Sequence, residues 1–155
     1  MSRLLDVCET TTITGHRIFG LVDMSVDTYS LDAEPGKWLL SAPGMVYLQV
    51  PSEVGRALVR LESWTTRAPV SDASWSGSEE VEVELPEGEL ALFTIDGGHE
   101  PIPLVLPWAG MYRMRWHWTF NRECGSLPVP SGFEEKTDGL DLYCLIQVWR
   151  TAAAA

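Results

Sequence analysis

The chain has 155 residues, of which 45% are hydrophobic, and 22 Asp and Glu residues against 11 Lys and Arg residues give a formal net charge of −11 at pH 7. This length and composition fit one globular domain and exclude a disordered or fibrous protein. The excess of carboxylates argues against nonspecific binding to nucleic acid or an anionic membrane, which needs clustered Lys and Arg side chains. It favours solubility and could steer the protein toward a basic partner, although an acidic composition is also common among bacterial cytosolic proteins.

Short extended segments separated by glycine and proline follow one another along the chain, without sustained helical spacing. The predicted strands cover residues 11–22, 45–50, 56–64, 79–85, 90–95, 102–106, 111–120 and 142–149. The long predicted loops cover residues 23–37, 65–78 and 121–138. About eight strands punctuated in this way predict an antiparallel β-sandwich, jelly-roll-like, with a closed β-barrel as the alternative.

The strongest alternation lies in residues 104–120. One face of the predicted strand carries Tyr112, Met114, Trp116, Trp118 and Phe120, and the other carries Arg113, Arg115, His117 and Thr119. Because successive side chains of a strand point to opposite faces, the first set is expected in the core and the second on the surface. We expect residues 102–106 and 111–120 to form a hairpin, and residues 79–85 and 90–95 to form another.

The two ends of the chain and its cysteines indicate the compartment. Cys8, Cys124 and Cys144 form no closely spaced pair, which favours a reducing environment over a disulfide framework. The first residues contain no apolar run that would make a signal peptide, and no run approaches the roughly 20 residues that cross a bilayer. We expect a cytoplasmic protein with one domain over residues 1–151 and a disordered alanine tail over residues 152–155.

Patterns that carry chemistry are weak in this sequence. Asp96, His99 and Glu100 share one turn, where a carboxylate and an imidazole could transfer protons, but Asp-Gly-Gly-His is more simply a hairpin turn. His16, His99 and His117 lack the short ligand spacing of a metal site. We therefore expect no enzyme, no cofactor and no metal.

An acidic strand is the first candidate for partner binding. Glu80, Glu82 and Glu84 alternate with Val81 and Val83, so the three carboxylates share one face of the predicted strand. They form either a solvated face paired with arginines of a neighbouring strand or a ridge that engages a basic protein.

Loop tryptophans are the second candidate. Trp38, Trp75 and Trp108 fall in or beside predicted loops. Each ring either plugs an end of the sandwich or contacts a partner, because burial of an aromatic side chain stabilises a fold and tryptophan is also a common interface anchor. A binding site for a small ligand or carbohydrate that uses these three rings is the alternative function, and an unpaired edge strand could mediate a homodimer.

Three segments together resemble a known family: MVYLQV at 45–50, VEVELPEG at 81–88 and PLVLPWAGMYRMRWHW at 103–118. They are similar to segments of the competence protein J family of bacterial DNA-entry nuclease inhibitors and, more broadly, of small all-β bacterial immunity proteins. The family's Leu-Pro-x-Gly-x-Tyr hairpin is matched by Leu106, Pro107, Gly110 and Tyr112, with one extra residue between proline and glycine. The resemblance covers about residues 13–120 and implies an acidic, non-catalytic protein that neutralises a nuclease or toxin.

Overall fold

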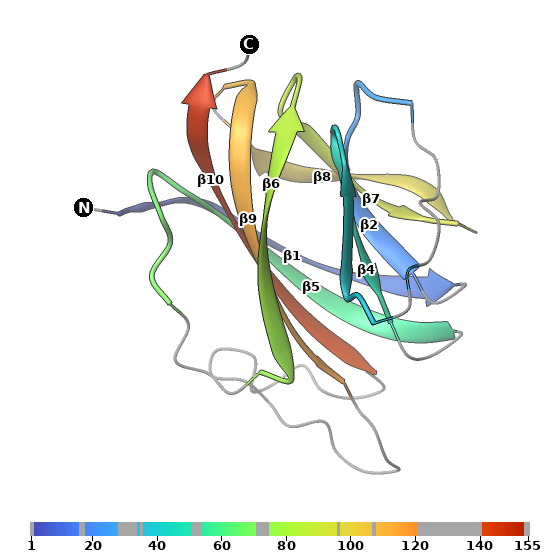
Figure 1. The fold of residues 1–155 in the computed structure, drawn as a ribbon. Coiled ribbons are helices and arrows are strands. Elements are labelled where there is room, and N and C mark those ends of the chain that lie inside the picture. Colours follow the sequence, from blue (N-terminus) through green and yellow to red (C-terminus); the bar gives the residue numbers. More distant parts are fainter. Residues whose placement is uncertain are drawn as a thin grey trace.

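All regular structure in the described part of the chain is β-strand. The computed structural model describes residues 2–15, 18–27, 34, 36–50, 54–70, 75–95, 97–106, 108–120 and 141–153. Its strands are β1 (Leu4–Gly15), β2 (Ile18–Asp23), β3 (Leu39–Ala42), β4 (Met45–Gln49), β5 (Val54–Trp64), β6 (Gly77–Leu85), β7 (Glu89–Thr94), β8 (Gly98–Val105), β9 (Gly110–Phe120) and β10 (Leu142–Ala153) (Figure 1). None of the described residues belongs to a helix that could span a membrane.

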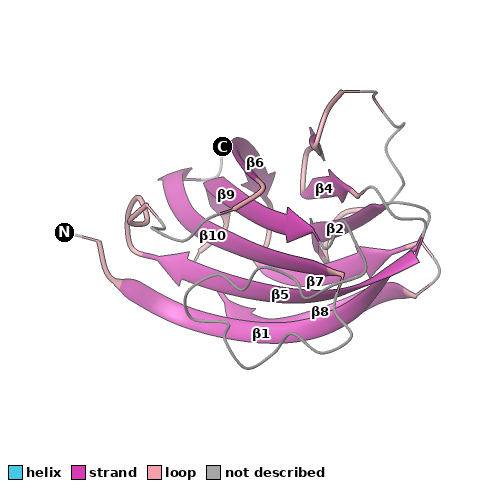
Figure 2. Ribbon diagram, turned by 90° about the horizontal axis from the view of Figure 1, so that it is seen from below, coloured by secondary structure: helices cyan, strands magenta, loops and turns pink. Residues whose placement is uncertain are grey.

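The strands form two layers of five. The first layer has the order β1-β5-β10-β9-β6 and the second has the order β3-β4-β2-β7-β8. The layers are joined where β1 turns into β2, at the pair Gly15 and Ile18. Figure 2 shows the long, curved strands β1 and β5 side by side, with β10 next to β5. Among the described strands β3 and β6, at the two ends of this path, are not hydrogen bonded, so the sheet does not close into a barrel.

The prediction of an all-β, sandwich-like fold is confirmed in its main features and corrected in its details. The described residues alone contain ten strands where about eight were expected for the chain, since residues 4–15 and 18–23 form separate strands and residues 39–42 add another. β10 runs parallel to β5, so the strands do not form the all-antiparallel, jelly-roll-like order that we expected. β10 also extends to Ala153, with Ala152 and Ala153 paired to Met111 and Gly110, where the sequence predicted a disordered tail.

Two predicted hairpins are wrong. β6 pairs with β9 in the first layer, whereas β7 pairs with β2 and β8 in the second. β8 likewise pairs with β7, whereas β9 pairs with β10 and β6. Both short connections therefore pass from one layer to the other instead of returning the chain beside itself. β7 and β8, by contrast, are antiparallel neighbours in the second layer.

A buried carboxylate fixes the first of these crossings, the turn between β6 and β7. Asp23, at the end of β2, is fully buried, and its Oδ2 accepts hydrogen bonds from the backbone N–H groups of Glu87 and Gly88 at 3.0 and 2.8 Å. Its Oδ1 accepts from the N–H and the hydroxyl of Ser25 at 2.9 and 2.6 Å. Gly88 has a φ of 76°, which only glycine adopts freely. The turn between β6 and β7 is thus fixed to the second layer.

The core lies between the layers and contains the aromatic face of β9. Tyr112, Met114, Trp116 and Trp118 are all buried there, as the alternation predicted. The ring of Trp116 packs on that of Phe19 of the second layer, with ring centroids 5.9 Å apart. The side chain of Phe120, the fifth predicted core residue, lies outside the described residues. Ala57, Val59 and Leu61 of β5 are buried in the same core, also as predicted.

The opposite face of β9 is also buried, contrary to expectation. Arg115 is 5% exposed, His117 is 4% exposed and Thr119 is 3% exposed. Ala68, Pro69 and Trp75 cover this face, because Arg115 donates to the carbonyl oxygens of the first two and the Trp75 ring stacks on His117. The prediction that His117 lies on the surface is therefore wrong.

Candidate functional site

The carboxylates of the acidic strand point away from the core, in register with β9. Glu80 lies opposite Arg115, Glu82 opposite Arg113 and Glu84 opposite Met111. The first two positions are therefore cross-strand ion pairs, the arrangement in which opposite charges stabilise a sheet.

Glu80 is the most heavily paired of the three. Its Oε1 accepts from Arg67 at 2.7 Å and from Arg115 at 3.0 Å, and its Oε2 lies 3.7 Å from Arg113. Arg113 also forms an ion pair with Glu82, at 3.2 Å. Within the described chain no ion pair involves Glu84, which is exposed. Much of the negative charge of this strand is therefore balanced by the protein itself.

The pairing continues across the whole first layer as a polar row on its outer face. Its members, one or two from each strand, are Glu9, Arg60, Glu62, Gln147, Arg115 and Glu80. The successive contacts measure 3.1, 3.0, 3.2, 3.3 and 3.0 Å. Charges of opposite sign alternate along the row, with one amide in the middle, so each buried polar group has a partner, as burial requires.

His117 borders the polar row at its buried centre. Its Nε2 lies 3.3 Å from Gln147 Oε1, and its ring stacks on Trp75 at 5.3 Å. Loss of hydration lowers the pKa of His117, and the positive charge of Arg115 adds to this effect, although the hydrogen bond to Gln147 opposes it. The imidazole is therefore held in its neutral form as part of the packing.

The three candidate tryptophans lie at three different places. Trp38 packs on Trp118, on the inner face of β9, with ring centroids 5.5 Å apart. Trp75 packs on His117, which points to the opposite face. Trp108 lies beside Tyr112, whose hydroxyl donates to the Trp108 carbonyl at 2.5 Å. Six residues of strand separate Tyr112 from Trp118, about 20 Å at the usual rise, so the rings do not form one surface.

Trp108 is the most exposed of the three and belongs to a cavity. Its side chain is 64% exposed, and the Arg150 guanidinium lies 5.7 Å from its ring centroid. The end of β6 is close by, because Leu85 pairs with Gly110 and the backbone at Gly88 approaches the Trp108 carbonyl. Two of the six candidate residues, Glu84 and Trp108, are thus brought to the same end of the molecule.

The described residues offer little for catalysis or metal binding. No group of three or more His, Cys, Asp and Glu side chains among them could hold a metal ion. Burial raises the pKa of the Cys144 thiol, and burial with nearby Asp6 and Glu9 raises that of Cys8, so neither thiol favours its reactive thiolate. His99 and Glu100 are exposed on β8. Asp96 and Cys124 lie outside the described residues.

The fold is similar to that of solved structures, whereas no family model and no curated protein sequence matches the chain. One is described as ComJ, inhibitor of the DNA degrading activity of NucA, from Bacillus subtilis. It has a TM-score of 0.65 and 13% identity over 97% of this chain and 99% of that one. The other is described as crocagin biosynthetic gene J, with a TM-score of 0.66 and 21% identity over 95% and 98%. The predicted resemblance to the nuclease inhibitor family is confirmed as a likeness of fold.

Sequence reasoning missed the residues that act through distant partners. Asp23 was assigned to the start of a loop, and Glu62 and Gln147 were treated as ordinary strand positions. A single polar residue inside an apolar strand, such as Gln147 in LYCLIQVW, was the available signal, because a buried amide needs partners. Nothing in the sequence indicated the cavity beside Trp108, since its lining residues come from five separate segments.

Proposed function

We propose that the chain is a non-catalytic binding protein that inhibits a basic protein partner, a nuclease or a toxin, in the cytoplasm. The observation that carries the proposal is the fold shared with ComJ along almost the full length of both chains, because ComJ is described as an inhibitor of a DNA-degrading activity. The net charge of −11 supports a basic target, since complementary charge speeds encounter and favours the correct partner.

The proposed contact surface is the end of the molecule where β6 finishes. Glu84 and Glu87 are exposed there, and Trp108 supplies an exposed aromatic ring at the same end of the molecule. An aromatic anchor beside charged residues is the usual composition of a protein interface. In this proposal Glu80 and Glu82 stabilise the strand and do not contact the partner directly, because their arginine partners already neutralise them. Trp38 and Trp75 serve as packing residues in this proposal.

Affinity capture from the native host tests the proposal. The purified chain is immobilised, and proteins retained at low salt are identified by mass spectrometry and assayed for DNA cleavage or toxicity with and without the free chain. We expect a basic protein whose activity the chain suppresses, with binding that weakens as salt rises. Retention of no protein, or of a protein whose activity the chain leaves unchanged, would contradict the proposal.

A carbohydrate site built from all three loop tryptophans is not part of the proposal. Stacking on a sugar needs rings that line one open surface, and Trp38, Trp75 and Trp108 lie against three different neighbours. Trp108 lines a cavity of a different chemistry, which also contains two arginines.

A further inference from the structure

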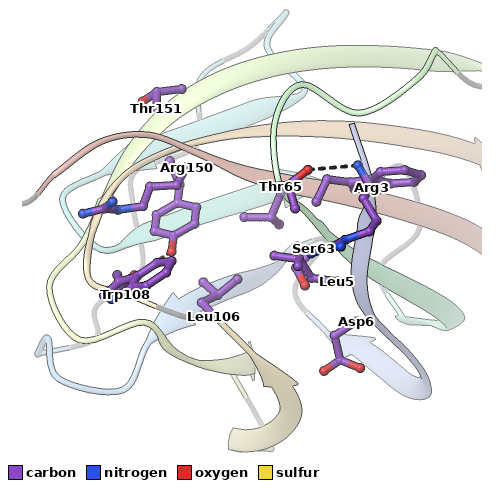
Figure 3. A pocket seen from close by; sticks show the side chains of 12 residues that line it. Arg3, Leu5, Asp6, Ser63, Thr65, Leu106, Trp108, Arg150 and Thr151 are labelled. Carbon is purple, nitrogen blue, oxygen red and sulfur yellow. Dashed lines mark hydrogen bonds between the residues drawn. The ribbon is translucent and has the colours of Figure 1, made fainter. Parts of the chain in front are cut away.

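A cavity of about 620 Å³ lies at the end of the molecule where β1 begins and β5 and β10 end (Figure 3). Its walls come from the start of β1, the end of β5, the β8–β9 connection, the start of β9 and the end of β10. Much of the lining is apolar, with Leu5, Trp64, Leu106, Trp108 and Val148. A space of this size and lining is typical of pockets that hold small organic molecules.

Two arginines give the cavity a positive character in an acidic protein. Arg3 and Arg150 line it together with a single carboxylate, Asp6. The ion pairs found among the described residues include neither Arg3 nor Arg150. Arg150 is oriented by the Trp108 ring and by a hydrogen bond from its Nε to the Ala109 carbonyl at 3.3 Å. Free guanidinium groups bind carboxylates strongly, because their N–H donors match the two oxygens.

The position of Arg3 is fixed by the neighbouring strand. Its backbone N–H donates to Thr65 Oγ1 at 2.9 Å, and its carbonyl accepts from the Thr65 N–H at 2.9 Å. The first of these bonds is drawn in Figure 3. The backbone of Arg3 is therefore held at the cavity, which leaves the guanidinium group available to a ligand.

A buried hydroxyl in the cavity wall is a second and independent sign of a ligand. Ser63 is 1% exposed, its side chain lines the cavity, and its Oγ has no hydrogen-bond partner within the described chain. A buried polar group without a partner destabilises a fold, so such groups in native proteins call for an explanation. A ligand oxygen inside the cavity would accept this hydrogen bond once the Ser63 side chain turns its hydroxyl toward the cavity.

The lining divides into a polar side and an aromatic side. Figure 3 shows Arg3, Ser63 and Asp6 on one side of the cavity, Trp108 and Arg150 on the other, and Leu106 between them. We propose that the cavity binds a small carboxylate with an aromatic or apolar body. The carboxylate meets Arg3 and the Ser63 hydroxyl, and the body lies against Leu106 and Trp108. Asp6 restricts the site to a ligand with little additional negative charge.

Paired probes test the proposal by calorimetric titration of the purified chain. The first pair is 3-phenylpropionate and the neutral alcohol 3-phenylpropanol, and the second is acetyl-leucyl-phenylalanine and its C-terminal amide. We expect each acid to bind at least about tenfold more tightly than its neutral partner. Selective binding of the first acid alone indicates a free small acid as the ligand, and of the second alone the C-terminus of a peptide. Equal binding within both pairs, or none at millimolar concentration, overturns the proposal.

Variants separate a ligand role from a structural one. Arg3→Gln and Ser63→Ala are each expected to weaken binding of the preferred acid about three- to tenfold, and Ser63→Ala to leave the melting temperature unchanged or higher, because its hydroxyl has no partner to lose. Arg56→Gln, an exposed arginine at the other end of β5, is the matched control and should bind normally. Full affinity in both cavity variants would overturn the proposal.

This inference is separate from the inhibitor function. Trp108 belongs both to the cavity and to the proposed contact surface, but the titration uses the purified chain alone. Failure of the probes to bind therefore leaves the partner proposal standing, and failure to capture a partner leaves the cavity proposal standing.

Discussion

Arg115 is the residue on which the outer face of the first layer most depends. Its guanidinium group donates to Glu80, to Gln147 and to two backbone carbonyls, and it lies 5.2 Å from the Trp149 ring centroid. Removal of the side chain leaves these groups without their donor in a mostly buried place, which costs free energy.

We predict that Arg115→Ala lowers the free energy of unfolding by about 3 kcal/mol or more, because it leaves part of a buried charge network unpaired. The matched control is Arg113→Ala, two residues along the same strand. Arg113 is more exposed and bonds only to Glu80 and Glu82, so its loss should cost no more than about 1 kcal/mol. Urea denaturation of both variants measures the difference, and equal losses would contradict the burial argument.

His117 should make the fold sensitive to acid. Its pKa is lowered in the folded protein, chiefly by burial, so the unfolded chain binds a proton more readily. The free energy of unfolding therefore falls as the pH drops through the ordinary histidine range near 6.5. In His117→Gln the decline between pH 7.5 and pH 5 should be shallower. The test is chemical denaturation across that range, and identical slopes for the two proteins would refute the assignment.

At the scale of the elements, the crossings between layers distinguish this fold from a set of hairpins. The carboxylate of Asp23 accepts two hydrogen bonds from the turn between β6 and β7 and so ties that turn to the end of β2. The sequence separation between these partners is more than sixty residues. This contact is therefore formed by the tertiary structure and not by the turn itself.

Asp23→Ala should destabilise the protein by about 3 kcal/mol, because the N–H groups of Glu87 and Gly88 lose a charged acceptor in a buried place. Ser25→Ala removes only one of the four donors to that carboxylate and should cost about 1 kcal/mol. Thermal unfolding of both variants provides the measurement. A smaller loss for Asp23→Ala than for Ser25→Ala would show that the turn holds its position without this carboxylate.

The alternation in the sequence was sufficient to predict most of the strands and the core between the layers, but not which strands pair. Tyr112, Met114, Trp116 and Trp118 had to share a buried face, because period two is a local property of an extended chain. The turns after Leu85 and Leu106 carry the same proline and glycine signals as hairpin turns, so nothing local shows that they change layers.

The sequence predicted polar positions correctly but not their burial. Arg115 and His117 alternate with core residues, which normally indicates a solvated face. This face is buried instead, because the residues around Ala68 supply carbonyl acceptors to it and Trp75 supplies an aromatic ring. Of the candidate site, the pairing of Glu80 and Glu82 with arginines was foreseen as one alternative, whereas the cavity required the assembled fold.

At the scale of the whole molecule, the effect of net charge on partner binding can be separated from the effect of the contact surface. Glu84→Lys alters the proposed contact surface, and Glu100→Lys makes the same change of net charge on β8, in the other layer. We expect Glu84→Lys to lower the affinity for the captured partner about fivefold more than Glu100→Lys does, since a single surface ion pair is worth up to about 1 kcal/mol. Equilibrium binding at physiological salt measures both, and equal effects would place the contact elsewhere.

The central claim is that the protein acts by occupying a partner and not by turning over a substrate. Titration of the captured partner's activity with the purified chain, at partner concentrations well above the dissociation constant, tests it most directly. A stoichiometric inhibitor should reduce the activity linearly to zero at a fixed whole-number molar ratio that does not change with incubation time. Progressive loss of activity at ratios far below equivalence would reveal catalysis, and no loss at any ratio would contradict the inhibitor function itself.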